Sequence, residues 1–258
     1  MKQDSIVGIH RGGGFLWPEE TQLAYTEAAQ RFPGALLEGD VRLTADGHVV
    51  MLHDRTLERT TDGAGAVDDM TLAEVQQFDA ACHFTPDGGK TYPYRGKGVR
   101  IPLFKDVLEA CPDSVFLIDL KAGEALPAAA IAVIREVGAA DRVILASFLP
   151  GLVDKARAIA PGIATAFCYP DGRKLFDALA QGQWEGYRPA AHMLALPAEL
   201  AAHFDVGAQE VAALKAKGIY TQIHTINEPA AMRKHLAEGF DNILTDRPDL
   251  LAQVLASE

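Results

Sequence analysis

The residues best suited to chemistry lie close together, in residues 36–54. Glu38 and Asp40 are two residues apart in a run of strand-forming residues, so both side chains project from one face of the expected strand. Like charges this close repel each other, and a folded protein tolerates the repulsion when a cation lies between them. The stretch is therefore predicted to form half of a metal-assisted active site.

An Asp-Gly pair, Asp46-Gly47, follows this strand and is the strongest short signal for a two-residue β-hairpin turn. If the chain turns back at this pair, Asp40 stands opposite His53. Residues that face each other in an antiparallel pair project from the same side of the sheet. The hairpin is thus expected to place an imidazole beside the two carboxylates.

The composition restricts the class of protein. The chain has 258 residues, 48% of them hydrophobic, which is enough for one substantial core. Its formal net charge of −11 argues against a nucleic-acid partner, because phosphate backbones are bound by a basic face. The three scattered cysteines show no zinc spacing. No stretch approaches the roughly 18 apolar residues of a membrane span, and none near the N-terminus resembles a signal peptide, so a cytoplasmic protein is expected.

Strand and helix patterns alternate along most of the chain. The expected strands begin near residues 6, 36, 115, 143, 163, 191, 219 and 242, the first covering 5–10. Helical patterns cover 20–32, 71–80, 102–111, 125–137, 150–160, 172–181, 208–217, 228–238 and 248–256. Eight strand–helix units are the count of a (β/α)8 TIM barrel, and an open doubly wound sheet would show the same alternation. Residues 55–100 break the rhythm and are predicted to be a small insertion after the second strand, within a single domain of residues 1–258.

The positions of the polar residues favour the barrel over the open sheet. Five of them lie at the C-terminal ends of expected strands: His10, Asp40, Asp119, Ser147 and His224. A barrel brings these ends together on one rim, whereas an open sheet spreads them along a line. The predicted fold is therefore an α/β TIM barrel whose rim carries the active site.

Short motifs run through the chain in a characteristic order. They are His10-Arg11-Gly12, Pro18-Glu19-Glu20-Thr21, Glu38-Gly39-Asp40, Asp46-Gly47, His53-Asp54, Thr56-Leu57-Glu58-Arg59-Thr60-Thr61, Thr71-Leu72-Ala73-Glu74, Asp119-Leu120-Lys121, Ser147-Phe148 and Thr245-Asp246-Arg247-Pro248-Asp249. Together they resemble the glycerophosphodiester phosphodiesterase family. The resemblance implies a TIM barrel with a small insertion, one divalent metal ion, and hydrolysis of glycerophosphodiesters to glycerol 3-phosphate and an alcohol.

Three positions depart from the pattern of that family. Asp119 stands where the family usually has Glu, and Glu20 stands where it usually has Asn. The shorter side chain of Asp119 can still bind a metal ion. His224 occupies a position where Trp is more common, which bears on the non-reacting end of the substrate.

Combined with the resemblance, the residue types suggest which residues bind the metal ion. Glu38, Asp40 and Asp119 provide three hard oxygen ligands, which suit Mg²⁺ or Ca²⁺ better than zinc. The alternative to metal binding is that these acids only form ion pairs with Arg42, Lys121 or Arg11.

The other roles concern proton transfer and phosphate binding. His10 and His53 are expected to act as general acid and base, because phosphodiester cleavage needs both and imidazole titrates near neutrality. Which of the two is the acid is left open. Arg11 and Lys121 are expected to bind the non-bridging phosphate oxygens. Weaker candidates for the pocket wall are Glu19, Phe148 and His224, and Asp246-Arg247-Pro248 is interpreted as a structural turn.

Two other functions stay open: a sphingomyelinase D-like lyase acting on lysophospholipids, and a catalytically silent barrel that binds a phosphorylated ligand. The sequence does not distinguish attack by water from attack by a neighbouring hydroxyl of the substrate, and it does not specify an oligomeric state. The basic and aromatic stretch 90–100, at the end of the insertion, is expected either to overhang the metal ion and contact the substrate or to be a solvated surface loop.

Overall fold

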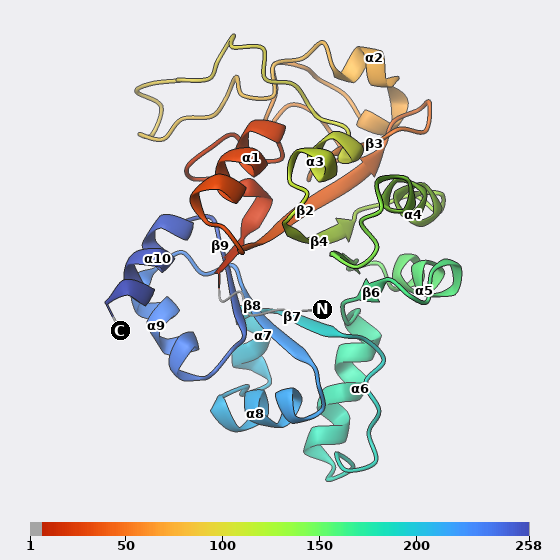
Figure 1. Ribbon diagram of the computed structural model, residues 1–258, viewed down its shortest axis with the longest axis vertical. Helices are drawn as coiled ribbons and strands as arrows, with labels where there is room; N and C mark the ends of the chain where they lie inside the picture. Colours follow the sequence, from red (N-terminus) through yellow and green to blue (C-terminus); the bar gives the residue numbers. More distant parts are fainter. Residues whose placement is uncertain (1–6, 258) are drawn as a thin grey trace.

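Apolar runs form parallel strands that curve around a common axis in the computed structural model, which describes residues 7–257 (Figure 1). Within these residues the parallel strands are β1 (Val7–Ile9), β2 (Leu36–Leu43), β4 (Val115–Leu120), β5 (Val143–Ala146), β6 (Ala164–Thr165), β7 (Met193–Pro197), β8 (Tyr220–His224) and β9 (Asn242–Thr245). They lie in the order β6-β5-β4-β2-β1-β9-β8-β7, and a parallel bridge between Ala166 and Met193 joins the two end strands. The predicted barrel is confirmed, and Ser5 and Ile6 of the expected first strand lie outside the described residues.

Helices cover the outside of the barrel (Figure 1). They are α1 (Gln22–Arg31), α3 (Phe104–Ala110), α4 (Leu126–Val137), α5 (Pro150–Ile159), α6 (Tyr169–Ala180), α7 (Ala198–His203), α8 (Ala208–Ala216), α9 (Pro229–Ala237) and α10 (Pro248–Ala256). Local signals set several ends: the Thr21 side chain accepts a hydrogen bond from the Ala24 amide to cap α1, and α4 stops at the left-handed Gly138. The short α7 was missed, because six residues carry little periodicity. None of the helices in residues 7–257 combines the length and apolar character required to cross a membrane.

The hairpin after β2 has a different register from the predicted one. Its return strand β3 (Val49–Met51) pairs with β2 so that Arg42 faces Val50. In this register the Asp40 carbonyl accepts a hydrogen bond from the Leu52 amide (2.9 Å). The prediction that Asp40 stands directly opposite His53 is therefore wrong by one residue.

The turn itself explains the shift. Gly47 adopts a left-handed conformation with φ of 84°, and its amide donates to the Thr44 carbonyl, which makes a three-residue loop. A two-residue type I′ turn would also require positive φ at Asp46, which does not have it. The Asp46 carboxylate instead accepts hydrogen bonds from the Thr44 hydroxyl (2.6 Å) and the Leu72 amide (3.0 Å).

The segment between β3 and α3 holds only short helices among its described residues, η2 (Val67–Asp69) and α2 (Leu72–Val75). It forms the orange-to-yellow loops beyond α1 and α3 in Figure 1. Its apolar residues make a small core with Val50 of β3 and with Leu52, which follows that strand. The segment is thus anchored outside the barrel, against the hairpin that carries the site.

Gly39 lies between the two carboxylates of β2, where the chain has no room for a side chain. A Cβ at this position would lie 2.1 Å from the Tyr25 hydroxyl and 2.6 Å from the Met51 methyl group. Because Tyr25 and Met51 are both fully buried, neither can move aside without disturbing the core. The close packing of α1 on β2 therefore holds Glu38 and Asp40 in place.

We predict that Gly39→Ala lowers the free energy of unfolding by about 1–3 kcal/mol, as expected for an overpacked core. The control is Gly172→Ala in α6, where a Cβ meets nothing within 4 Å; it should be neutral or stabilising by up to about 1 kcal/mol. Denaturant unfolding of both variants measures the difference. Equal stability of the two would show that Tyr25 does not pack on β2 as described.

Candidate active site

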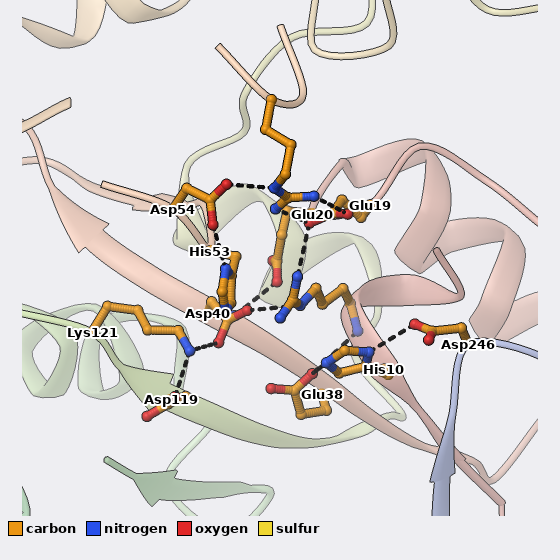
Figure 2. A network of polar contacts seen from close by, with 12 residues as sticks. His10, Glu19, Glu20, Glu38, Asp40, His53, Asp54, Asp119, Lys121 and Asp246 are labelled. Carbon is orange, nitrogen blue, oxygen red and sulfur yellow. Dashed lines mark hydrogen bonds and ion pairs between the residues drawn. The ribbon is translucent and has the colours of Figure 1, made fainter. Parts of the chain in front are cut away.

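The carboxyl ends of neighbouring strands bring the predicted site residues together on one rim of the barrel. Glu38 and Asp40 come from β2, and Asp119 comes from the neighbouring β4, where it is paired with Asp40. His10 follows β1, and His53 follows β3. Figure 2 shows these side chains converging on a common space, with Lys121 on one side and Asp246 on the other.

Cationic side chains balance the buried Asp40, which is only 1% exposed. The Lys121 ammonium lies 2.8 Å from Asp40 Oδ1 and 2.7 Å from Asp119 Oδ2, so it bridges the two carboxylates. The Arg11 guanidinium lies 3.3 Å from Asp40 Oδ2. Burial alone would raise the pKa of Asp40, but Lys121 and Arg11 outweigh it and hold that pKa below its ordinary value.

The negative charges of the neighbouring acids Glu38 and Asp119 are offset less completely by cations. Burial and the charge of Asp40 raise the pKa of Glu38 to about 7. Burial likewise raises the pKa of Asp119, although Lys121 partly opposes the effect. The site therefore carries more buried negative charge than its cations fully offset.

His10 is oriented by an acid from the far end of the chain. Its Nδ1 lies 2.7 Å from Asp246 Oδ1, and the second oxygen of Asp246 accepts a hydrogen bond from the Asn227 amide (2.9 Å). Burial lowers the pKa of His10, but Asp246 and Glu38 more than offset that and raise it above its ordinary value. Asp246 thus contacts and orients the His10 ring, which the interpretation of 246–248 as a structural turn did not include.

His53 is oriented in the same manner by its neighbour. Its Nδ1 lies 2.6 Å from Asp54 Oδ1, and Asp54 also pairs with Arg59. Arg59 in turn donates two hydrogen bonds of 2.7 Å to Glu19, whose Oε1 also accepts one from Arg11 (3.2 Å). This series of pairs joins His53 to the phosphate-binding candidate Arg11, so Glu19 serves the cluster as a link.

The two rings consequently share one arrangement. In each, Nδ1 is taken up by a carboxylate, and the other ring nitrogen is left to face the cluster. The Nε2 of His10 lies 3.9 Å from Glu38 Oε2, and the Nε2 of His53 makes no hydrogen bond with a described residue. A carboxylate on one nitrogen fixes the ring orientation and leaves the other nitrogen able to accept or donate a proton.

Glu20 holds the backbone of β2 beside the cluster. It is buried. Its Oε1 accepts a hydrogen bond from the Asp40 backbone amide (3.0 Å), and its Oε2 accepts one from the Tyr25 hydroxyl (2.6 Å). Burial and the charges of Asp40 and Glu38 raise the pKa of Glu20 well above its ordinary value. The residue that departs from the family pattern at this position therefore holds the backbone of β2. Its place in the Pro18-Glu19-Glu20-Thr21 motif was the only signal for this role in the sequence.

The chemistry of these oxygens fits a divalent cation. Asp119 Oδ1 is buried and has no partner among the described residues, whereas Asp40 Oδ2 accepts no hydrogen bond but lies 3.3 Å from the Arg11 guanidinium. Among residues 7–257, no three His, Cys, Asp or Glu side chains are already arranged around a common metal position, since Lys121 lies between Asp40 and Asp119. The donors are of the type that Mg²⁺ and Ca²⁺ prefer, and the unpaired Asp119 Oδ1 is free to bind a cation.

An apolar pocket adjoins the carboxylates. Glu38 and Asp119 form one end of its wall. Of the three weaker candidates, Phe148 and His224 line it, whereas Glu19 lies in a separate cleft. Burial, together with the positive charges of His10 and Lys121, lowers the pKa of His224 to about 4, so its ring is neutral near pH 7. These two residues are thus part of the pocket wall, as expected.

The stretch 90–100 of the insertion is not part of that wall. Its Arg95 stacks on Tyr92, with 3.6 Å between the guanidinium carbon and the ring centroid, and donates to the Cys82 carbonyl. Its last residues, with 101 and 102, line a groove against α1 instead. The part of the insertion that reaches the cluster is Arg59.

Comparison with known proteins identifies the family. The model of the glycerophosphoryl diester phosphodiesterase family matches residues 10–250. The chain belongs to this family. It is 30% identical, over 97% of its length and 98% of the relative, to a glycerophosphodiester phosphodiesterase of Caldanaerobacter subterraneus subsp. tengcongensis.

Solved structures share the fold of this phosphodiesterase. The glycerophosphoryl diester phosphodiesterase domain of an uncharacterized Mycobacterium tuberculosis protein has a TM-score of 0.84 at 24% identity, covering 99% of this chain and 100% of that one. A phosphodiesterase from Oleispira antarctica, crystallised with the product sn-glycerol-3-phosphate, has a TM-score of 0.77 at 25% identity, covering 97% and 96%. The predicted family, barrel and phosphodiesterase activity are confirmed.

The contact between His10 and Asp246 leads to a test of the positioning role. Asp246→Ala removes the group that holds the His10 ring, so kcat of the phosphodiesterase should fall by about 10²-fold, within the range for loss of acid–base catalysis. The control is Asp249→Ala, three residues on, whose carboxylate pairs only with Arg247 among the described residues. Steady-state kinetics on one phosphodiester measures both variants. Equal kcat values would remove Asp246 from the mechanism.

Proposed function

We propose that this phosphodiesterase hydrolyses glycerophosphodiesters to glycerol 3-phosphate and an alcohol. In the proposal His10 and His53 transfer protons, Arg11 and Lys121 bind phosphate, and Glu38, Asp40 and Asp119 hold one divalent cation, Mg²⁺ or Ca²⁺. The observation that carries it is the convergence of two carboxylate-bound imidazoles on one cluster of buried carboxylates. The sn-glycerol-3-phosphate bound to the Oleispira antarctica phosphodiesterase supports the choice of product.

Arg11 and Lys121 are placed to bind the phosphate of the substrate. Each forms an ion pair with the buried carboxylate of Asp40, so both positive charges lie on the same part of the rim. A phosphodiester carries one negative charge, and its non-bridging oxygens accept hydrogen bonds from guanidinium and ammonium groups. Both side chains would also offset the charge that builds on the phosphoryl oxygens in the transition state.

The two imidazoles supply the proton transfers. Overall, an oxygen–phosphorus bond forms to water, the bond to the departing alcohol breaks, and one proton moves from the water to the alkoxide. One ring removes the proton from the attacking oxygen, while the other gives a proton to the leaving oxygen. The same pair would serve equally if a neighbouring hydroxyl of the substrate attacks first and water then opens the cyclic phosphate.

A bound divalent cation would add positive charge at Glu38, Asp40 and Asp119 and polarise the phosphoryl group. The unpaired Asp119 Oδ1, with the raised pKa of Glu38, supports this part of the proposal. The proposal keeps a small-molecule substrate, in line with the net charge of −11, which disfavours a nucleic-acid partner. It also keeps a cytoplasmic location.

The metal site predicts a linked change in activity and stability. Chelator should abolish release of glycerol 3-phosphate, and Mg²⁺, Ca²⁺ or Mn²⁺, added back singly, should restore it. A cation present at about 100 times its Kd stabilises the fold by about 2.7 kcal/mol, so chelator should lower Tm by about 5–10 °C.

The matched variant for this test is Asp40→Asn. It should be inactive, and its Tm should be nearly insensitive to chelator, because one of the ligands has lost its charge. An active, chelator-insensitive wild-type protein would refute the metal site. If chelator lowered Tm equally in wild type and variant, the cation would bind elsewhere.

The proton-transfer pair predicts a second pattern. His10→Ala and His53→Ala should each lower kcat by at least about 10²-fold while thermal unfolding stays cooperative. The control is His48→Ala, an exposed histidine on the same hairpin, which should keep normal turnover. Near-normal kcat in either of the first two variants would exclude that residue from the reaction.

A further inference from the structure

A polar cleft lies on the insertion side of the catalytic cluster. It encloses about 540 Å³ of empty space, within the range of small-molecule sites. Its wall joins the segment between β1 and α1, which contributes Glu19, to the insertion, which contributes Arg59 and His83. The cleft and the apolar pocket share no lining residue among those described. In the view of Figure 2, Glu19 lies on the opposite side of the cluster from Asp119, where the apolar pocket begins.

The inner edge of this cleft contacts groups that serve the reaction. Glu19 accepts a hydrogen bond from the candidate phosphate-binding residue Arg11 (3.2 Å). Gly14, also in the wall, lies next to the acid that orients His10, since a Cβ at Gly14 would lie 3.4 Å from Asp246 Oδ1. A diester whose phosphate is bound by Arg11 therefore has one of its two arms within reach of the cleft.

The charged groups of the cleft are already paired with one another. Glu19 Oε1 accepts hydrogen bonds from Arg59 and Arg11, and Glu19 Oε2 accepts a second one from Arg59 (2.7 Å). The remaining guanidinium nitrogen of Arg59, Nε, donates to Asp54. Both carboxylate oxygens and all three guanidinium nitrogens thus have partners. A charged head group in the cleft would have to break these pairs to gain a counter-charge.

Two other polar groups of the wall are available to a ligand. The Thr60 hydroxyl and the His83 imidazole make no hydrogen bond with a described residue. By contrast, the Thr85 hydroxyl donates to Asp87 (2.9 Å) and accepts from the Gly89 amide (2.7 Å). Hydroxyl and imidazole groups both donate and accept hydrogen bonds, as the hydroxyls of a polyol do. The open hydrogen-bonding capacity of the cleft therefore matches hydroxyl groups.

Apolar surface completes the wall. Pro18 and Ala80 are buried, and the half-buried Phe84 packs against Tyr94, with 5.7 Å between the ring centroids. Phe84 provides the one benzene ring of the described wall, whereas a quaternary ammonium is typically bound by a cage of several aromatic rings. A cyclic polyol presents hydroxyls at its edge and C–H groups on its faces, a combination that fits this wall.

The exposure of the two spaces indicates which arm of the diester enters the cleft. Arg59 and His83 are exposed, so the cleft opens to water. The apolar pocket instead runs between nearly fully buried residues, among them Leu117, Leu194 and Leu244. Because the alcohol departs into water when the ester bond breaks, the cleft gives it a direct exit.

We propose that this cleft binds the alcohol part of the glycerophosphodiester, and that it selects an uncharged polyol such as inositol over choline or ethanolamine. This inference rests on the proposed function. Thr60 and His83 recognise hydroxyl groups of the polyol. The reaction is the same hydrolysis: water adds to phosphorus, the bond to the polyol oxygen breaks, and the polyol leaves with the proton of the water.

The test compares head groups of matched shape. Release of glycerol 3-phosphate is measured for its diesters with inositol, with cyclohexanol and with choline. The cyclohexyl diester has the ring size and charge of the inositol diester but lacks the free ring hydroxyls. A hydrogen bond to substrate is worth about fivefold in KM, so two of them should make KM for the inositol diester lower by about tenfold or more than for the other two.

Variants test the two recognition residues. Thr60→Val and His83→Leu should each raise KM for the inositol diester by about fivefold and change KM for the cyclohexyl diester by less than about twofold. Thr60→Ser and His83→Gln keep a donor and an acceptor and should recover part of the loss. The control is Thr56→Val, the same change at an exposed position of the insertion outside the cleft, which should keep both wild-type KM values.

KM is the readout because it does not depend on the fraction of folded protein. Differences between the leaving alcohols are also removed when one diester is compared between wild type and variant. A variant that folds poorly but binds normally therefore keeps the wild-type KM.

The outcomes separate this inference from the proposed function. If the diesters are cleaved with equal KM for inositol and cyclohexanol, or with the lowest KM for choline, the polyol cleft is refuted and the proposed function stands. The same holds if Thr60→Val and His83→Leu both leave the inositol KM unchanged. If none of the diesters releases glycerol 3-phosphate, both are refuted. A low inositol KM that these two variants raise and Thr56→Val keeps supports the cleft.

Discussion

Buried negative charge is the constraint around which the rim of the barrel is built. Four acids with almost no exposure share it: Glu20, Glu38, Asp40 and Asp119. Two cations, Arg11 and Lys121, lie against them. Because a buried charge without a partner is strongly destabilising, each acid must be paired, protonated or bound to a further cation. The pKa values follow this requirement, falling for Asp40 between the two cations and rising for Glu38, which lies farther from them.

The same requirement extends outward through the histidines. Each imidazole that faces the cluster is held from behind by a carboxylate, Asp246 for His10 and Asp54 for His53. Asp54 also pairs with Arg59 near the start of the insertion. A segment that packs outside the barrel thereby helps to hold His53 on the rim, and this gives the insertion a structural reason to lie where it does.

The barrel interior is divided between two kinds of surface. The half formed by β1, β2 and β4 carries charge at the rim, while β5, β6 and β7 carry small apolar residues at corresponding levels. The attraction between a cationic side chain and a phosphate is stronger when the neighbouring wall excludes water, because a low local dielectric weakens screening. The apolar half therefore serves the chemistry of the charged half, whatever arm of the substrate lies against it.

The sequence by itself determined the number and order of the strands and which polar residues lie at their ends. Apolar runs, glycine stops and the His10-to-Asp249 series of motifs are local features, and the barrel brings strand ends together whatever the details of packing. Those features were enough for the family, the fold and the convergence of His10, Glu38, Asp40, His53 and Asp119 on one rim.

The tertiary structure alone decided which side chains meet there and how. Asp246 reaches His10 across 236 residues, a contact that no local pattern encodes. The hairpin register depended on backbone angles at Asp46 and Gly47 that the Asp-Gly pair does not specify uniquely. The pocket exists because alanines of separate strands fall side by side, and a void is a property of packing among strands rather than of any one segment.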